Sequence, residues 1–459
     1  MQLVVQIVLA RILSPEIFGV LAIMLVVTQI ADSIAQSGLG MALIQKLDAT
    51  ARSYSTAWWL SLGLAAVLYA IIFSLAPIIA SFYTMPGLDV YLRVLGLVVF
   101  FNSANSIQRS YLQRSMGFRH IFRASTVAAF LSGVAGIALA FLGCGMWALV
   151  AQTLSLSFFT CVAMWLQIAW KPSWEFDPAQ ARELFGYGWK ICATGVLNVF
   201  YQGISELILG HTASSGELGL YSQGRKYPSA AISVLSNSIA NVLFPSFAKV
   251  KGNHEELNRK IHEALSLGTF IVAPASLLAA VVAEPLVSIL LTDKWLACVP
   301  IFQLTCVSNA VLILQLVNLR AYMALGCSGL YLRLQLAKVL GGGSIIWATA
   351  AISHNIYATA VATSMVAILS VLCVDLPPAK RIHGYGELSQ LKDQLPVYVL
   401  SIVASFAGMV AGLIPMPSWI MLITQTLVFS AVFLMGTRLF GFRQFFQLVS
   451  LAKGLLKRG

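Results

Sequence analysis

Apolar stretches, most of them 20 or more residues long, follow one another along nearly the whole chain. The hydrocarbon core of a bilayer, about 30 Å thick, takes roughly 20 helical residues to cross, and helices satisfy their own backbone hydrogen bonds there. We therefore predict an all-α polytopic membrane protein with about fourteen transmembrane helices. The expected spans are 1–13, 16–36, 56–82, 88–107, 121–142, 145–170, 186–209, 218–247, 264–291, 296–318, 330–352, 355–376, 395–414 and 418–437.

Composition excludes several other classes of protein. With 59% hydrophobic and 10% charged residues, a soluble domain could not cover its apolar surface. The net charge of +12 comes from cations spread through short connectors without interleaved aromatic residues, so no nucleic-acid partner is expected. The seven cysteines form no CxxC pair and the six histidines are scattered, so we expect neither a metal nor another cofactor.

The cations are distributed unequally between the two sides of the expected membrane. If the N-terminus is cytoplasmic, all but five of the 29 Lys and Arg fall on cytoplasmic connectors or the adjoining helix ends. The positive-inside rule then predicts a multi-pass protein of the cytoplasmic membrane with both termini in the cytoplasm. The basic, apolar tail 441–459 should rest on anionic phospholipids of the inner leaflet. The five cations of the outer side are Arg11, Arg93, Arg225, Lys226 and Lys294.

The first span is unusually short, with thirteen residues before Ser14. It has no preceding basic region and no following small-residue cleavage site, which argues against a signal peptide. We expect instead that the chain begins inside what should be helix 1, which would leave this helix short at its cytoplasmic end.

The two halves of the chain contain matching short motifs. Residues 18–20 (Phe-Gly-Val) match 218–220 (Leu-Gly-Leu), and weaker matches in the same order link 76–81 with 284–288 and 109–112 with 320–323. Offsets near 200 to 211 residues indicate a duplication, and six spans per copy give both copies the same orientation. The expected organisation is a six-helix bundle at 1–183, a second at 184–376, two further helices at 395–440 and the tail at 441–459.

Several segments together resemble a known family. The chain resembles the bacterial polysaccharide and O-antigen flippases, Wzx-type and colanic-acid-exporter-like members of the multidrug/oligosaccharidyl-lipid/polysaccharide superfamily. It departs from their pattern at Glu206, where the family more often has Asp. The segments that carry the resemblance are Leu9–Gly19, Ala31-Asp32, Gly38–Gln45, Glu206–Gly210, Leu218–Ser222, Phe244-Pro245 and Trp295.

The resemblance implies a two-bundle fold like that of the superfamily's multidrug transporters. It also implies that the protein flips undecaprenyl-diphosphate-linked oligosaccharide across the bacterial inner membrane, for O-antigen or exopolysaccharide synthesis. The expected partners are this lipid-linked oligosaccharide, a coupling proton or sodium ion, and other membrane proteins of polysaccharide assembly. Two alternatives stay open: a multidrug or cation antiporter of the same superfamily, and a membrane-embedded polysaccharide polymerase or ligase.

Charged residues inside spans are costly, so they are candidates for function. Arg225 and Lys226 fall about 10–12 Å into the expected span 218–247, where adjacent cations suit a diphosphate; interfacial anchoring is the alternative. Arg11 is a further candidate cation, or it closes a short turn with Glu16.

The intramembrane acids Asp32 and Glu206 are candidates to bind the coupling ion, or they are satisfied structural carboxylates. Asp375, beside Pro377-Pro378, is interpreted as the end of a span. The run Gly341–Gly343 is interpreted as a site of close helix packing.

Overall fold

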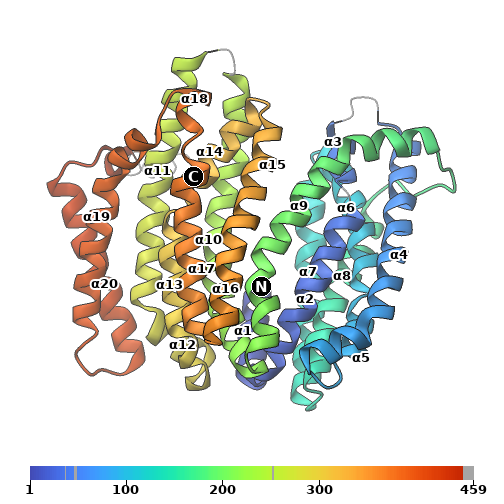
Figure 1. The fold of residues 1–459 in the computed structure, drawn as a ribbon, viewed down its shortest axis with the longest axis horizontal. Helices are drawn as coiled ribbons and strands as arrows, with labels where there is room; N and C mark the ends of the chain where they lie inside the picture. Colours follow the sequence, from blue (N-terminus) through green and yellow to red (C-terminus); the bar gives the residue numbers. More distant parts are fainter. Residues whose placement is uncertain (37, 46–48, 251–252, 448–459) are drawn as a thin grey trace. The chain divides into compact units, whose positions relative to one another are not determined.

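The computed structural model describes residues 1–36, 38–45, 49–250 and 253–447. It divides into two compact units, Met1–Ser222 and Gln223–Gly459, and each is a bundle of long helices (Figure 1). The described residues contain no strand. The boundary between the units lies inside a helix and after residue 183, so the first unit includes the helix that opens the expected second bundle. Of the expected tail 441–459, residues 448–459 lie outside the described part.

The first unit is built around one central helix, α6. Helix α6 packs on α2, α4 and α8, α2 packs in addition on α9, and α1 and α8 both pack on α7. The helices of this unit are α1 (Gln2–Ile12), α2 (Pro15–Gln36), α3 (Leu39–Gln45), α4 (Ala51–Tyr83), α5 (Leu88–Leu95), α6 (Val98–Arg114), α7 (Phe118–Phe141), α8 (Met146–Gln167), α9 (Pro178–Thr212) and the first turns of α10 (Ser215–Lys249).

The second unit packs around α11, which contacts α13, α14 and α19. Helix α17 packs on α13 and α16, and α19 pairs with α20. The helices that follow α10 are α11 (His254–Val281), α12 (Ala283–Leu291), the 3₁₀ helix η1 (Asp293–Cys298), α13 (Val299–Ala310), α14 (Leu312–Ala324), α15 (Ser328–Ala337), the π-helical turn η2 (Lys338–Gly342), α16 (Gly343–Ser353), α17 (Ile356–Ser370), the π-helical turn η3 (Val371–Asp375), α18 (Ala379–His383), α19 (Glu387–Ala411) and α20 (Ser418–Leu439).

Short polar motifs fix where several helices begin. Thr50 and Ser53 form a reciprocal capping box at the start of α4, with the Ser53 amide donating to Thr50 Oγ1 at 3.3 Å. Asp177 caps α9 by accepting from the amides of Ala179 and Gln180. These hydrogen bonds together with the Arg52 guanidinium lower the pKa of the Asp177 carboxyl, which keeps this half-buried cap ionised.

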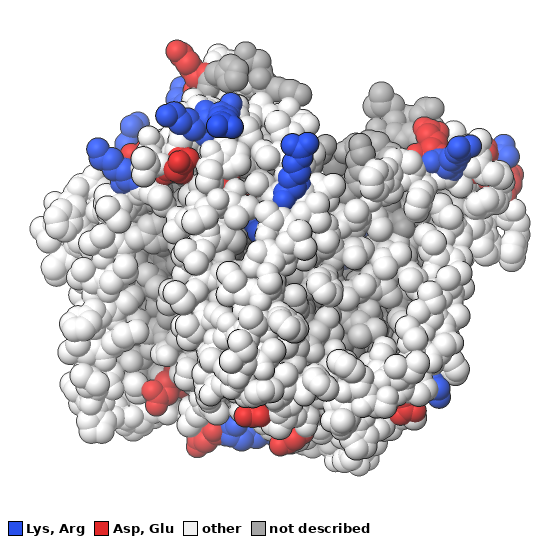
Figure 2. Space-filling view, in the orientation of Figure 1, with Lys and Arg blue, Asp and Glu red and all other residues white. Residues whose placement is uncertain are grey.

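Long apolar helices confirm the polytopic membrane class. Among the described residues, eleven helices are long and apolar enough to cross a bilayer, or twelve if the pair α13 and α14, bent by 42°, forms one span. In Figure 2 the coloured charged residues gather mainly toward the two ends of the helices, with a largely uncharged band between them. The predicted count of fourteen is not confirmed, and α1, with 11 residues, is shorter than a span.

The structure adds detail to two features of the second unit that were interpreted from the sequence. Asp375 ends the π-helical turn η3, just before Pro377-Pro378, and its side chain is in addition fully buried in an ion pair with Lys338. Within the run Gly341–Gly343, Gly343 is buried in the helix α16, whereas a Cβ atom on Gly341 would meet nothing within 4 Å, so close packing does not extend to Gly341. It lies instead in the π-helical turn η2, where one extra residue is accommodated in the helix.

Candidate functional site

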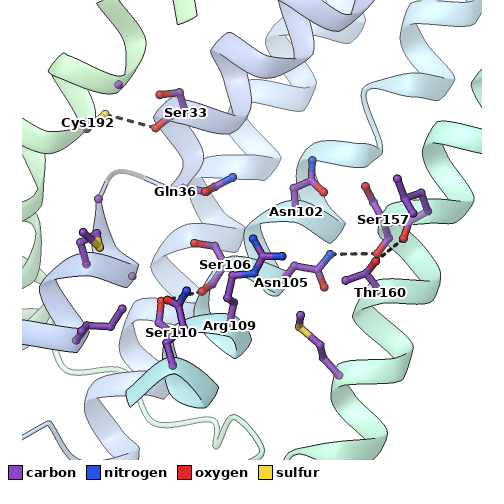
Figure 3. Close-up of a pocket in the computed structure, with 18 residues that line it drawn as sticks. Ser33, Gln36, Asn102, Asn105, Ser106, Arg109, Ser110, Ser157, Thr160 and Cys192 are labelled. Carbon is purple, nitrogen blue, oxygen red and sulfur yellow. Dashed lines mark hydrogen bonds between the residues drawn. The ribbon is translucent and has the colours of Figure 1, made fainter. Parts of the chain in front are cut away.

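A polar cavity of about 560 Å³ lies among α2, α3, α6, α8 and α9 of the first unit. Its walls carry amide and hydroxyl groups together with some apolar side chains (Figure 3). The residues that line it are Ser33, Gln36, Gly38, Gly40, Met41, Ile44, Asn102, Asn105, Ser106, Arg109, Ser110, Gln113, Leu156, Ser157, Thr160, Met164, Cys192 and Gly195.

Helix α6 supplies a polar stripe to this cavity. Its six lining residues recur at offsets of three, four, seven, eight and eleven positions, which is the spacing of one helix face. We did not predict this stripe from the sequence. The signal was present, because a span that carries polar residues at helical spacing must turn them toward an interior site. The stripe consists of Asn102, Asn105, Ser106, Arg109, Ser110 and Gln113.

Hydrogen bonds hold the cavity wall in place. Asn105 Nδ2 donates to the Ser157 carbonyl at 3.1 Å and so ties α6 to α8. Ser110 Oγ donates to the carbonyl of Ser106 at 2.8 Å, one turn earlier on α6. Asn105 Oδ1 is buried and has no partner among the described residues, so this wall keeps an unused acceptor. A buried acceptor of this kind favours a bound donor such as a hydroxyl group.

Arg109 carries the one charge among the described lining side chains. It is exposed, and Figure 3 shows it beside Asn105 and Ser106. A guanidinium among neutral hydrogen-bonding groups can form charge-assisted, bidentate bonds to a phosphate while amides and hydroxyls bind a sugar. The site can therefore bind a polar molecule that carries negative charge.

Asp32 lies directly behind the cavity wall. Its Oδ2 atom accepts from Nδ2 of Asn102, a lining residue, at 2.6 Å, and its neighbour Ser33 also lines the cavity. The Asp32 Oδ1 atom is buried without a hydrogen-bond partner in the described residues. The structure thus joins one predicted site residue to the cavity.

The other predicted site residues lie elsewhere. Glu206 is half-buried on α9 and Arg11 is exposed at the end of α1, and neither lines the cavity. Arg225 and Lys226 are half-buried on α10 and belong to the second unit.

Comparisons with known proteins place this geometry in context. The family described as "Polysaccharide biosynthesis protein" matches residues 8–300. The chain is similar to the succinoglycan biosynthesis transport protein ExoT of Rhizobium meliloti strain 1021, with 24% identity, and to the lipopolysaccharide biosynthesis protein WzxC of Escherichia coli K12, with 27% identity. Each match covers 66% of this chain and 62% of the relative, so the chain spans less than two thirds of the length of these curated relatives.

Solved structures share the fold. The inward closed conformation of the lipid II flippase MurJ matches with a TM-score of 0.75 and 14% identity over 96% of both chains. An inward-facing multidrug resistance MATE family transporter of the MOP superfamily matches with a TM-score of 0.65 and 13% identity, over 87% of this chain and 95% of that one. The predicted superfamily fold is confirmed.

Proposed function

Because this chain belongs to the family of polysaccharide biosynthesis proteins, we propose that it moves a lipid-linked oligosaccharide from the inner to the outer leaflet of the bacterial cytoplasmic membrane. The cargo we propose is an undecaprenyl-diphosphate-linked repeat unit for O-antigen or exopolysaccharide synthesis. A sugar diphosphate needs a polar path through hydrocarbon, whereas its polyprenyl tail can stay in the lipid. The transport protein among the relatives and the flippase among the structural neighbours support this proposal.

The polar cavity of the first unit is the observation that carries the proposal. Neutral amides and hydroxyls can exchange hydrogen bonds with sugar hydroxyls, and the Arg109 guanidinium can bind a phosphate. Its 560 Å³ lies within the range of small-molecule sites and would hold part of a repeat unit at a time. We therefore add Arg109 to Arg225, Lys226 and Arg11 as a proposed cation for the diphosphate.

Ion coupling is the second part of the proposal, with Asp32 and Glu206 as the candidate carboxylates. The Asp32–Asn102 hydrogen bond supports Asp32, since a proton or sodium ion bound at this carboxylate would change the partner of a residue in the cavity wall. Coupling of this kind needs an ion and a cargo that bias the same element. Both termini in the cytoplasm and contacts with other assembly proteins remain part of the proposal.

The runner-up function is export of cationic drugs, which the MATE neighbour favours. A cationic drug requires an acidic or apolar site, whereas the described cavity lining carries a guanidinium. A polysaccharide polymerase or ligase is a third candidate, and no specific observation favours it.

One experiment separates the candidates. The purified protein is reconstituted into proteoliposomes with a labelled undecaprenyl-diphosphate oligosaccharide, and appearance of the label in the opposite leaflet is followed with and without a proton or sodium gradient. A fluorescent cationic drug is tested in parallel. We expect protein-dependent, gradient-stimulated movement of the lipid and no drug movement. Drug movement without lipid movement would contradict the proposed function.

A further inference from the structure

A fully buried ion pair lies in the second unit. Lys338 Nζ is 2.7 Å from Asp375 Oδ2, and the two side chains are only 2% and 0% exposed. Both residues fall within helices that are long and apolar enough to cross the membrane. An intramembrane charge pair contributes little to stability after its desolvation and is a functional candidate by default.

Both partners of this pair lie on π-helical turns. Lys338 begins η2 and Asp375 ends η3, and η2 packs on α17 while η3 packs on α15. A π-helical turn carries one extra residue, distorts the hydrogen bonds of the α-helix and is frequent at functional sites. Each member of the buried charge pair lies on a π-helical turn, which indicates that the backbone is shaped to bring these two groups together.

The two carboxylate oxygens of Asp375 have different environments. Oδ2 accepts from Lys338 Nζ and from Gln315 Nε2 at 2.7 Å, and the Asp375 carbonyl accepts from the Tyr322 hydroxyl at 2.8 Å. Oδ1 is equally buried, yet it has no hydrogen-bond partner among the described residues. A buried carboxylate oxygen without a donor is costly, and a proton bound there removes that cost.

Few other ionisable groups lie near this carboxylate. The Tyr322 hydroxyl of α14 donates to the backbone carbonyl of Asp375, and His383 of α18 stacks on the Tyr322 ring with centroids 6.0 Å apart. The remaining ionisable residues of the helices packed on η3 are half-buried or exposed, so Lys338 is the charged group that sets the state of Asp375. They are Arg320, Tyr331, Arg333 and Tyr357.

We propose that the Lys338–Asp375 pair is a proton-exchange site of the second unit, separate from the Asp32 carboxylate of the first. On proton uptake an O–H bond forms at Asp375 Oδ1, the carboxylate becomes a neutral acid, and Lys338 stays an ammonium group. The site then changes from net neutral to a charge of +1. Release of the proton restores the pair.

Proton uptake at this site should move Lys338. An unpaired ammonium group is unstable in an apolar interior, so it must leave Asp375 or find another acceptor. The turn η2 can yield, because Gly341 has open space where a side chain would be. The site thereby links protonation to a change in the helix that contains Lys338, which is the requirement for coupling a proton to transport.

The test uses the full chain in lipid nanodiscs and pH-difference infrared spectroscopy, which reports the carbonyl stretch of a protonated carboxyl group. We expect the wild type to gain such a band as the pH falls. The neutral double variant Lys338→Met with Asp375→Asn, which leaves no unpaired buried charge, should lose it. Asp393→Asn serves as the matched control, because Asp393 is a partly exposed acid of the same unit. The Asp393→Asn variant should keep the infrared band assigned to protonated Asp375.

An identical difference spectrum in the wild type and the double variant would overturn the proposal. If the double variant does not fold, Asp375→Glu keeps the charge and should shift the band; an unshifted band would also overturn it. This readout needs no cargo, so failure of the wild type to flip lipid would contradict the proposed function alone. A transport measurement, which rests on that function, should show the double variant insensitive to a proton gradient.

Discussion

Gly19 and Gly219 occupy equivalent positions in a contact between α2 and the first turns of α10. A Cβ atom on Gly19 would lie 1.8 Å from the carbonyl oxygen of Ser215, and one on Gly219 would lie 1.9 Å from the carbonyl oxygen of Pro15. Gly19 and Gly219 are 200 residues apart, and so are Pro15 and Ser215, which is the offset of the sequence motifs that contain the two glycines. The contact is therefore self-complementary, as a duplicated chain with two-fold pseudosymmetry would form it.

Replacing either glycine should destabilise the protein, because the new methyl group meets backbone that cannot rotate away. We expect Gly19→Ala and Gly219→Ala each to cost about 1–3 kcal/mol of stability or more, as overpacking does. Thermal unfolding in detergent measures the effect. The matched control is Gly63→Ala on α4, where a Cβ atom meets nothing within 4 Å and Ala favours the helix. Equal melting temperatures for all three variants would contradict the close contact between α2 and the first turns of α10.

Arg109 should contribute to affinity for a lipid-linked diphosphate. Arg109→Gln removes charge-assisted hydrogen bonds of about 1.5–3 kcal/mol, so binding should weaken about tenfold to a hundredfold. Arg109→Lys should be milder, because it keeps the charge and loses the bidentate geometry. Arg93→Gln is the control, since Arg93 lies over the Phe73 ring away from the cavity. Equal affinities for the wild type and Arg109→Gln would remove Arg109 from the site.

The adjacent cations of α10 make a separate prediction. Arg225→Gln combined with Lys226→Gln should slow leaflet translocation of a labelled undecaprenyl-diphosphate sugar at equal protein density, whereas Arg225→Lys alone should be less impaired. The double variant should still insert into the membrane, because removal of charge from a membrane helix eases its insertion. A wild-type rate in the double variant would make both residues interfacial anchors.

Asp32 should affect the ion dependence of transport more than cargo binding. Asp32→Asn removes the ionisable group and keeps a side-chain oxygen that can accept from Asn102. We expect transport to lose its dependence on an imposed gradient while cargo affinity changes little. Glu206→Gln is tested beside it. Unchanged gradient dependence in both variants would assign these acids to structure.

Orientation in the membrane follows from the unequal charge distribution. On a cysteine-free background, a cysteine at Asn253 should be labelled only from the cytoplasm, and one at Ser214 only from outside. An impermeant thiol reagent applied to intact cells and to inverted vesicles gives the measurement. Labelling of both positions from one side would require a different number of spans between them.

Length and hydropathy were sufficient to predict the membrane class, because each apolar stretch needs only local sequence to specify a helix. The superfamily fold was predicted from the family resemblance. The number of spans was harder to predict from hydropathy. The segment 296–318 forms parts of two helices that meet at a bend near Val311, and hydropathy does not register such a bend. Segment 1–13 is apolar yet forms only eleven helical residues.

The candidate site was less predictable, because it depends on which faces of several helices meet. Attention to charge identified Asp32 but missed its partner Asn102, a neutral residue. The ion pair of Lys338 with Asp375 was not predicted, because the two residues are 37 positions apart in sequence. They meet only when the two π-helical turns pack together. The neutral polar stripe of α6 could have been found by its helical spacing.

The composition of the cavity wall has a consequence for turnover. Amides and hydroxyls offer a ligand nearly the same hydrogen bonds that water offers, so each exchange contributes little net free energy, and one guanidinium adds a limited electrostatic attraction. A carrier with such a wall would hold its cargo loosely and tolerate changes in the stereochemistry of individual sugars. Its throughput would then be set by how often the protein changes conformation, rather than by how slowly the cargo departs.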